Sequence, residues 1–522
     1  MNRRAFIILL LGATTGGWYY MTHRQSADQQ TSSTVTIALE GNPISIDPIN
    51  VQDVHSSQVA TTVHAPLGWV GQNGTIVPMV AQKMEMAADG KTLIVTLNPD
   101  ASFWNDAPVK PDDVIYSLER YRKSQNLHRW ILDRVAGVKE FDDKTAEHVS
   151  GLTSPAPSVV QISFAEPEPD AALMLCNLSV AIVQKGSGEA AAKPFGTQVI
   201  GCGPYAPGEF EPSLFHCKLR KPTAGKPAEL VFRVIPDDAA RIAAVRNGEA
   251  NLVRLRGPMI AEVTNSGVGS LQPKANMPGT QVGVFKANEL CYSIFNWASP
   301  KLASVPEADR RNLVLALSQA VDRARLVSEL FPAGCAEATA SIAPPSAGAA
   351  ALPSLSPAPA GVTFPTGLVL VSANDSASRQ LAIAVQKQLQ AKGIIIQTEF
   401  VDLGALIGKL IKKEFDLMGF WIELQIASSG PTAWCSFFHK GAPLSVFGEA
   451  RSDVGALLAE ARGTLDPAQR AQAYRNVVST IDERQSSWLP LLSRKAITIQ
   501  RNGTVPWFDV NGTPVNGLIQ AK

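Results

Sequence analysis

The sequence predicts an α/β protein of several domains. From Thr34 onward, segments typical of β-strands alternate with amphipathic helical patterns, and this alternation is characteristic of α/β folds. The chain has 522 residues, enough for two to four domains, and its 45% of hydrophobic residues can fill complete cores. We therefore expect several packed domains built from strands and helices.

The first 33 residues differ from the rest of the chain. Arg3 and Arg4 precede a run of about 17 mostly apolar residues, and a polar spacer (residues 22–33) follows. This order predicts an export signal or a signal anchor, and the paired arginines resemble a twin-arginine signal. We expect export across the bacterial inner membrane to the periplasm. Cleavage and retention as a membrane anchor both stay open, because no small-x-small site follows the apolar run; a buried N-terminal helix is the alternative.

The stretch SFWNDAPVKPDDVIYSLER (residues 102–120) predicts a tight turn followed by a helix. The preceding segment Leu93–Leu97 has the composition of a strand, and Asn105 and Asp106 tolerate the left-handed backbone of a tight turn. Pro111 suits the first position of a helix, and the two acids after it suit the positive helix end. We interpret these acids as a helix cap rather than a catalytic pair.

Four later segments have the apolar spacing of amphipathic helices. They are Arg310–Leu330, Ser376–Lys392, Arg451–Arg462 and Pro467–Glu483. Between the first and the second, residues 336–365 are rich in Ala, Pro and Ser and almost free of charge. This composition predicts a linker or a crossing over the surface.

Composition and missing motifs exclude several classes of function. The net charge is +1, so no basic field attracts nucleic acid or an anionic membrane. The chain contains no G-x-S-x-G, S-x-x-K or phosphate-binding loop motif, and we expect no catalytic residue. An exported hydrolase is the alternative. No C-x-x-C or H-E-x-x-H is present, so we expect neither a metal site nor a cofactor.

The six cysteines are widely spaced along the chain. Cys202 and Cys217 flank a predicted hairpin within residues 201–219, and an oxidising compartment would allow a disulfide between them. Free buried thiols are the alternative, because free cysteine is often part of a core.

The stretch at residues 102–120 also resembles a known family. Its F-W-N-D-A-P-V-K-P-D-D-V-I-Y-S is similar to the F-h-D-G-x-P-V-T-A-x-D-V-x-Y-S segment of bacterial extracellular solute-binding proteins of the oligopeptide/dipeptide/nickel-binding class (solute-binding family 5). Asp106 stands where that segment usually has glycine. Other similar segments follow in the order of the family, among them ISIDP (44–48), GCGPY (201–205), RIAAVRNGEANLV (241–253) and FDLMGFWIEL (415–424).

This resemblance implies a periplasmic-binding-protein type II-like fold, with two lobes, a third smaller subdomain and a ligand cleft between the lobes. Hinge bending would interconvert an open and a ligand-closed state. Residues 1–33 would precede the folded body. Lobe I would be discontinuous (34–60, 193–281 and 489–522), the small subdomain would be 61–192, and lobe II, with the Ala/Pro-rich segment, would be 282–488.

The resemblance also suggests ligand-binding residues. Peptide-binding members use a G-W-x-A-D-Y motif whose acid pairs with the α-ammonium of the ligand, and the corresponding text here is G-F-W-I-E-L. With Phe420 at the tryptophan position, Glu423 takes the place of the acid, which suits a cation sealed in a dry cleft. A strand-end glutamate is the alternative, and a slip of one residue would put Leu424 there.

Beside Glu423, four side chains are candidates for the cleft. Trp421 and Trp434 are suited to the wall of a ligand pocket, as is Phe420, although a place in the core is the alternative for each. Arg379 offers a bidentate fork for a peptide carboxylate, with a solvated helix arginine as the alternative. The segments that depart from the family pattern lie in lobe II, so the resemblance carries the fold further than the ligand class.

We therefore expect the substrate-binding component of an ABC importer. It would be a monomer that binds a peptide or a similar small solute between its lobes and delivers it to a permease and ATPase complex in the inner membrane. The alternatives are a nickel, opine or sugar receptor on the same scaffold, and a membrane-tethered sensor or chaperone-like protein that keeps the fold without transport.

Overall fold

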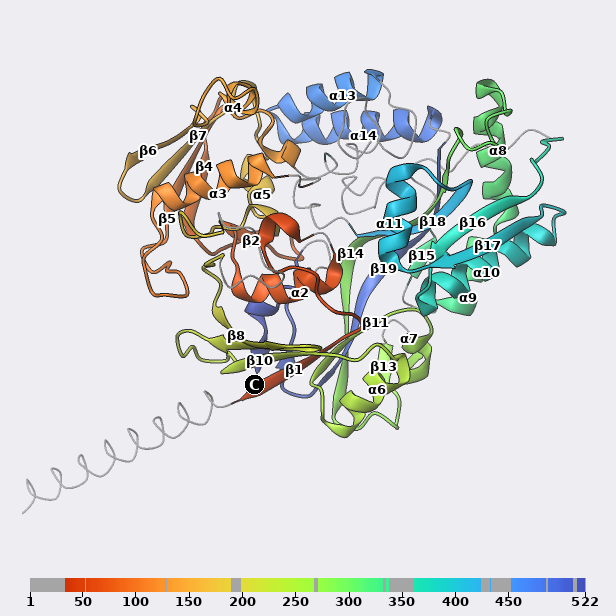
Figure 1. Ribbon diagram of the computed structural model, residues 1–522, viewed down its shortest axis with the longest axis horizontal. Helices are drawn as coiled ribbons and strands as arrows, with labels where there is room; N and C mark the ends of the chain where they lie inside the picture. The colour runs from red at the N-terminus through yellow and green to blue at the C-terminus, as the bar shows by residue number, and fades with distance from the viewer. Residues whose placement is uncertain are drawn as a thin grey trace, which may run out of the picture.

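The computed structural model shows a mixed α/β protein, as the sequence predicts (Figure 1). Within the described residues, no helix is long and apolar enough to cross a membrane. The predicted signal segment lies outside these residues. The structure describes residues 33–521 except 52, 125, 127–128, 189–198, 267–270, 332–334, 338–360, 424–431, 433–451, 485–486 and 510–513.

A large mixed sheet of eleven strands organises the described part of the chain. Its order is β17-β16-β18-β14-β19-β11-β1-β10-β9-β8, and β15 also pairs with β19. The strands are β1 (Thr34–Leu39), β8 (Tyr205–Glu211), β9 (Leu214–Leu219), β10 (Glu229–Val234), β11 (Leu252–Leu255), β14 (Thr280–Phe295), β15 (Cys335–Glu337), β16 (Leu368–Ala373), β17 (Ile396–Val401), β18 (Leu417–Glu423) and β19 (Trp488–Arg501).

The two long strands β14 and β19 run through the middle of the molecule and join its two halves (Figure 1). Residues 280–285 of β14 pair with 496–501 of β19, next to β11. Beyond a register shift, residues 289–294 pair with 488–494, next to β18. At the shift, three residues of β14 (286–288) lie opposite a single residue of β19, which is a large β-bulge.

A separate sheet in the order β4-β5-β7-β6 forms a smaller unit, at the left in Figure 1. The helix α3 (Pro111–Lys123) belongs to this unit and begins at the predicted Pro111. Asp106 has a φ of 63°, the left-handed turn conformation that the sequence predicts. The Asp113 carboxylate accepts a hydrogen bond from the Lys110 N–H (2.8 Å), and so caps the helix. The strands are β4 (Ala81–Met86), β5 (Thr92–Leu97), β6 (Leu152–Ala156) and β7 (Val159–Ser163).

A buried ion pair connects this unit to the segment that follows β1. The guanidinium of Arg120, on α3, donates to both carboxylate oxygens of Asp47 (2.9 and 2.6 Å), and the Asp47 side chain is almost fully buried. Asp47 belongs to the ISIDP segment and Arg120 to the stretch 102–120, so two segments that carry the family resemblance meet here.

The same unit also packs against two helices formed by residues 452–484. One hydrophobic core contains residues of the four-stranded sheet, such as Val95, together with Val477 of α14. Beside this core, the buried carboxylate of Glu168 pairs with Arg462 of α13. The helices α13 (Ser452–Gly463) and α14 (Pro467–Arg484) therefore lie over the small unit as well as over the large sheet (Figure 1).

The predicted helices are present, with one correction. The segment Arg310–Leu330 forms two helices, α8 (Glu307–Ala320) and α9 (Arg323–Leu330), instead of one. Asp322 separates them, because its side chain accepts a hydrogen bond from the Arg325 N–H (2.9 Å) and caps the second helix. The segment Ser376–Lys392 forms α10 (Ser376–Gln390). Most of the Ala/Pro-rich segment lies outside the described residues.

The remaining helices and short strands complete the described chain. The helices are α2 (Val54–Val63), α4 (Val138–Asp142), α5 (Ala171–Met174), α6 (Asp238–Asn247), α7 (Pro258–Val263) and α11 (Leu403–Lys412). Three two-stranded pairs are β2 (Gly68–Val70) with β3 (Ile76–Pro78), β12 (Thr264–Ser266) with β13 (Leu271–Pro273), and β20 (Thr504–Val505) with β21 (Gln520–Ala521).

The disulfide expected between Cys202 and Cys217 is not formed, and both residues are free thiols. The predicted hairpin is present as β8 and β9, but Cys217 lies opposite Pro207 on this ladder, and its side chain is buried in the core. The Cys202 thiol instead donates to the backbone carbonyl of Ile182 (3.2 Å). The alternative of free thiols is the one that the structure shows, with Cys217 buried and Cys202 partly buried.

Candidate functional site

The structure places three of the residues suggested by the sequence on one strand. Phe420, Trp421 and Glu423 lie on β18, where their backbones pair with Tyr292, Cys291 and Glu289 of β14. The backbone of these three residues is described and their side chains are not. Trp434 lies outside the described residues. The predicted acid thus stands at the end of β18, opposite the residue of β14 that follows the bulge.

Arg379 lies in the first turn of α10 and makes local contacts. Its guanidinium donates to the Asn374 side chain (2.7 Å) and lies over the ring of Phe400, 4.3 Å from the ring centre. Phe400 is on β17, and β16 separates that edge strand from β18. The described contacts therefore hold Arg379 near the edge of the large sheet, away from Glu423 on β18.

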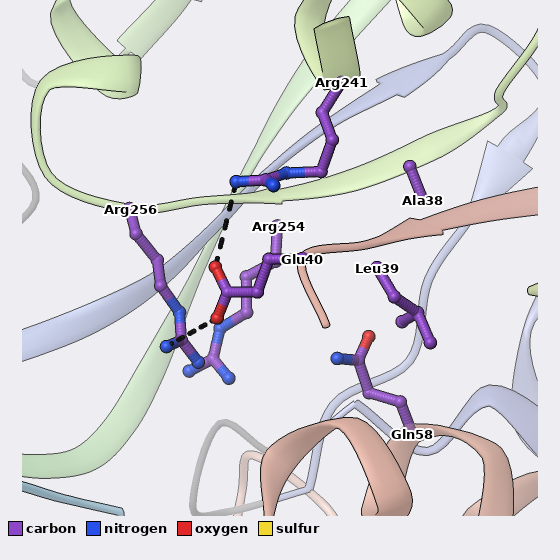
Figure 2. Close-up of a pocket in the computed structure, with 7 residues that line it drawn as sticks. All are labelled: Ala38, Leu39, Glu40, Gln58, Arg241, Arg254 and Arg256. Carbon is purple, nitrogen blue, oxygen red and sulfur yellow. Dashed lines mark ion pairs between the residues drawn. The ribbon is translucent and has the colours of Figure 1, made fainter. Parts of the chain in front are cut away.

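The structure also reveals a polar pocket at the carboxyl ends of β1 and β11 (Figure 2). These strands are parallel neighbours, so both chains leave the sheet at the same edge, a common location for ligand sites in α/β folds. Gln58 of α2 closes one side. The lining residues are Ala38, Leu39, Glu40, Gln58, Arg241, Arg254 and Arg256.

Glu40 stands at the centre of this pocket, between two arginines (Figure 2). One carboxylate oxygen is 2.9 Å from Nη1 of Arg256, and the other is 3.8 Å from Nη2 of Arg241. The Arg241 side chain is nearly inaccessible, while those of Glu40 and Arg256 are 29% and 21% exposed. The carboxylate is therefore held from the buried side and stays open to solvent on the other.

Electrostatics keep Glu40 ionised. Burial opposes the charge, but the attraction of Arg256, His55 and further arginines outweighs it and lowers the pKa of Glu40 from 4.5 to about 2. Burial likewise lowers the pKa of His55, against the pull of Glu40. An ionised Glu40 beside arginines is thus the state of the pocket at neutral pH.

Arg494 lies between this pocket and the strand that carries Glu423. It lies on β19, its side chain is buried, and it interacts electrostatically with Arg254, Arg256 and Glu40. On the ladders, Arg494 is opposite Glu289, and Glu289 is opposite Glu423. The backbone of Glu423 is therefore two strand spacings, roughly 10 Å, from that of Arg494. The Glu40 pocket and the predicted acid Glu423 therefore lie at the same height along the strands of the large sheet, beside the bulge of β14.

Sequence reasoning missed the pocket. Arg254 and Arg256 alternate with apolar residues in the segment V-R-L-R-G, which is the period of a strand with one polar face. That pattern alone does not show that Glu40 and Arg494, hundreds of residues away, meet the same face. Within the described residues, no group of His, Cys, Asp and Glu side chains could hold a metal ion.

Comparisons with known proteins identify the family. The family model "Bacterial extracellular solute-binding proteins, family 5 Middle" matches residues 75–442, well over half of the chain. The protein belongs to this family of solute-binding proteins. Its members bind solutes and are not enzymes, which confirms the expectation from the missing catalytic motifs.

Relatives and solved structures agree with this assignment. The glutathione-binding protein GsiB of Escherichia coli O6:K15:H31 (strain 536 / UPEC) is 23% identical over 501 residues, covering 90% of this chain and 90% of GsiB. The murein tripeptide binding protein MppA of Escherichia coli superposes with a TM-score of 0.77 at 18% identity, over 94% of this chain and 98% of MppA. Haemophilus influenzae OppA, in complex with the peptide RPPGFSPFR, gives a TM-score of 0.78 at 15% identity, over 94% and 99%.

These structures confirm the predicted periplasmic-binding-protein fold across nearly the whole chain. MppA is described as a periplasmic protein, so the fold is shared with proteins of that compartment.

The depressed pKa of Glu40 predicts a pH-dependent contribution to stability. A carboxylate whose pKa is lower in the folded state stabilises that state above its unfolded pKa, and the contribution is lost as the pH falls toward the folded pKa. At pH 7, Glu40→Gln should lower the free energy of unfolding by on the order of 3 kcal/mol. This difference should shrink steadily between pH 4.5 and pH 3.

Urea unfolding of both proteins at pH 7, 5, 4 and 3 measures this difference. Glu85→Gln is the control, because Glu85 is 55% exposed and pairs with an exposed Lys83; its effect should stay below about 1 kcal/mol at each pH. A difference for Glu40→Gln that does not vary with pH would show that the ionised carboxylate does not stabilise the fold.

Proposed function

We propose that this protein is the substrate-binding component of an ABC importer and binds a short peptide or peptide-like solute between its lobes. The match of residues 75–442 to the solute-binding family carries this proposal. It is supported by GsiB, MppA and OppA, whose names and structures concern glutathione, a murein tripeptide and a peptide. In such a cleft the peptide would bind partly through its backbone, which leaves the side-chain pockets permissive.

The sheet supports a hinge mechanism. The two halves of the large sheet are joined through β14 and β19, and the bulge at residues 286–288 interrupts their pairing at the crossing. Bending there would open or close a cleft without breaking the ladders on either side. The Glu40 pocket and the end of β18 lie beside this bulge. Contacts that a ligand makes with both lobes would therefore exist only in the closed state.

The division into lobes follows from the same proposal. Lobe I would comprise 34–60, 193–281 and 489–522, the small subdomain 61–192, and lobe II 282–488. The described strands support this division, because β14 passes from the β11 side of the sheet to the β18 side beyond Gln281.

Delivery requires export and a membrane partner. We propose that the segment before Ser33 takes the chain out of the cytoplasm, and that a permease and ATPase complex in the inner membrane receives the ligand from a monomeric protein. Two observations support this location. MppA is described as a periplasmic protein, and residues 1–33 run from charged to apolar to polar, as in an export signal.

Ligand binding should close the lobes. Small-angle scattering of the purified protein, with and without a library of tripeptides, should show a smaller radius of gyration with ligand, and the melting temperature should rise. If no peptide mixture and no extract of periplasmic solutes changes either quantity, the transport function loses its main support.

Glu423 should pair with the α-ammonium of the ligand. Glu423→Gln keeps the shape and removes the charge, so binding should weaken by about 2–5 kcal/mol, the cost of breaking a buried charged hydrogen bond, with little change in fold stability. N-acetylation of the peptide should weaken binding strongly for the wild type and much less for the variant. Equal penalties of acetylation in both proteins, measured by calorimetry, would place the ammonium elsewhere.

The N-terminal segment should direct export. A reporter that is active only outside the cytoplasm, fused after Ser33, should be active in a bacterial host. A silent reporter, with a cytoplasmic reporter active at the same position, would reverse the assigned compartment. Replacement of Arg3 and Arg4 by lysine separates the two routes, because only twin-arginine export depends on the arginine pair.

A further inference from the structure

Charged side chains gather where the small unit meets the helices α13 and α14. Arg134, Glu168 and Asp170 belong to the small unit, while Arg462 lies on α13 and Arg470 on α14. These five side chains are between 1% and 16% exposed. Largely buried charges are therefore concentrated at a contact between two parts of the molecule that are about 300 residues apart in the chain.

Glu168 is the centre of the first group of contacts. Its Oε2 accepts a hydrogen bond from Nη2 of Arg462 and lies 3.7 Å from Nε of Arg134. Arg134 in turn donates through Nη2 to the backbone carbonyl of Ala459 on α13 (2.8 Å). Two hydrogen bonds, each with a charged donor, therefore cross from the small unit to α13 or back.

A second ion pair joins the small unit to α14. Nη2 of Arg470 is 3.2 Å from Oδ1 of Asp170. Nη1 of the same guanidinium donates to the backbone carbonyls of Thr464 (2.7 Å) and Leu465 (2.8 Å), between α13 and α14. The guanidinium is therefore held by its own segment and presented to Asp170.

Pairing offsets the burial of these acids only in part. Burial raises the pKa of Glu168 against the attraction of Arg462 and Arg134, and it raises the pKa of Asp170 against the attraction of Arg470. Within the part of the chain that the structure describes, Oε1 of Glu168 and Nε of Arg462 have no hydrogen-bond partner. Such ion pairs add little net stability, yet removal of one partner is strongly unfavourable because the other charge stays buried and unpaired.

Apolar contacts oppose this cost. The helices α13 and α14 share a hydrophobic core with the small unit, so the burial of apolar surface favours the contact. Separation of the two surfaces would expose part of that core but would hydrate the five charges. Because the two effects have opposite signs, the contact is suited to opening and closing reversibly.

Covalent and polar links attach the small unit to lobe I of the proposed division. The chain enters the unit from α2 and leaves it toward β8. The buried pair of Arg120 and Asp47 adds to these links, and Arg220, just beyond β9, donates to the carbonyl (2.7 Å) and the hydroxyl (2.8 Å) of Ser102. When the hinge bends, the small unit therefore stays with lobe I, and its contact with α13 and α14 is the one that separates.

We propose that Arg134, Glu168 and Asp170 of the small unit, together with Arg462 and Arg470, form a latch that joins when the cleft closes and separates when it opens. This inference rests on the proposed function and concerns how closure is controlled. The closed state pairs the five charges and the open state hydrates them, so a ligand needs only a modest difference in affinity to shift the balance.

The test measures small-angle scattering of the whole exported body without ligand. Arg462→Gln leaves Glu168 without this partner in the closed state, where it cannot be hydrated, so the radius of gyration should rise above that of the wild type. Glu168→Gln should have the same effect by leaving Arg462 unpaired. The double variant should return toward the wild-type value, because this pair then leaves no unpaired buried charge.

Arg120→Gln is the matched control. Arg120 and its partner Asp47 are 11% and 2% exposed, against 11% and 1% for Arg462 and Glu168. This variant breaks an equally buried pair that the proposed movement does not separate. Its melting temperature should therefore fall while its radius of gyration stays that of the wild type. The melting temperatures of all variants show whether each of them folds.

The affinity for a peptide gives a second readout. Because a ligand that needs the closed state binds more weakly when that state is less populated, Arg462→Gln should weaken the binding of trialanine by about fivefold or more. Arg120→Gln should leave it nearly unchanged. Calorimetry measures both affinities.

The outcomes separate the latch from the proposed function. If trialanine closes the protein, and Arg462→Gln matches Arg120→Gln in scattering and in affinity, the latch is overturned and the proposed function stands. If trialanine does not bind, the scattering without ligand decides: a larger radius of gyration in Arg462→Gln alone supports the latch, and an unchanged one overturns it. A larger radius in Arg120→Gln instead also overturns it, because the small unit would then move with α13 and α14.

Discussion

Backbone hydrogen bonds between β14 and β19 hold the two halves of this protein in one sheet. β11 joins the ladder on one side of the bulge, and β15 and β18 join it on the other. The small unit is attached to the same frame by the ion pair of Asp47 and Arg120 and by the core beneath α13 and α14. The ladder is interrupted at residues 286–288, which is where the proposed hinge would lie.

The strands of this sheet set the positions of the polar groups in the site. Glu40 is placed by the end of β1, Arg254 and Arg256 by the end of β11, and Arg494 by the part of β19 just beyond the bulge. None of these positions is set by a flexible side chain alone, since each follows directly from a paired strand. A carboxylate among arginines at the ends of β1 and β11 is therefore a fixed feature of the fold.

Much of the fold was predictable from the sequence, because its signals are local. Pro111 and Asp106 predicted a helix start and a turn that the structure contains, and Ser376–Lys392 predicted α10. The break at Asp322 was missed, since an N-cap inside a continuous apolar pattern does not interrupt the helical period. The arginine pocket was missed for a different reason: Glu40 and Arg494 are far apart in the chain, and only strand pairing brings them together.

The position of β19 has a consequence for how the chain folds. This strand lies in the centre of the large sheet but comes from residues 488–501, while its neighbours β11 and β14 are made about 200 residues earlier. Each half of the sheet can pair within itself before β19 is made, but the two halves are joined only through β19. Such non-local pairing slows folding. The topology thus makes the union of the two halves a late step, after their separate strands have been synthesised.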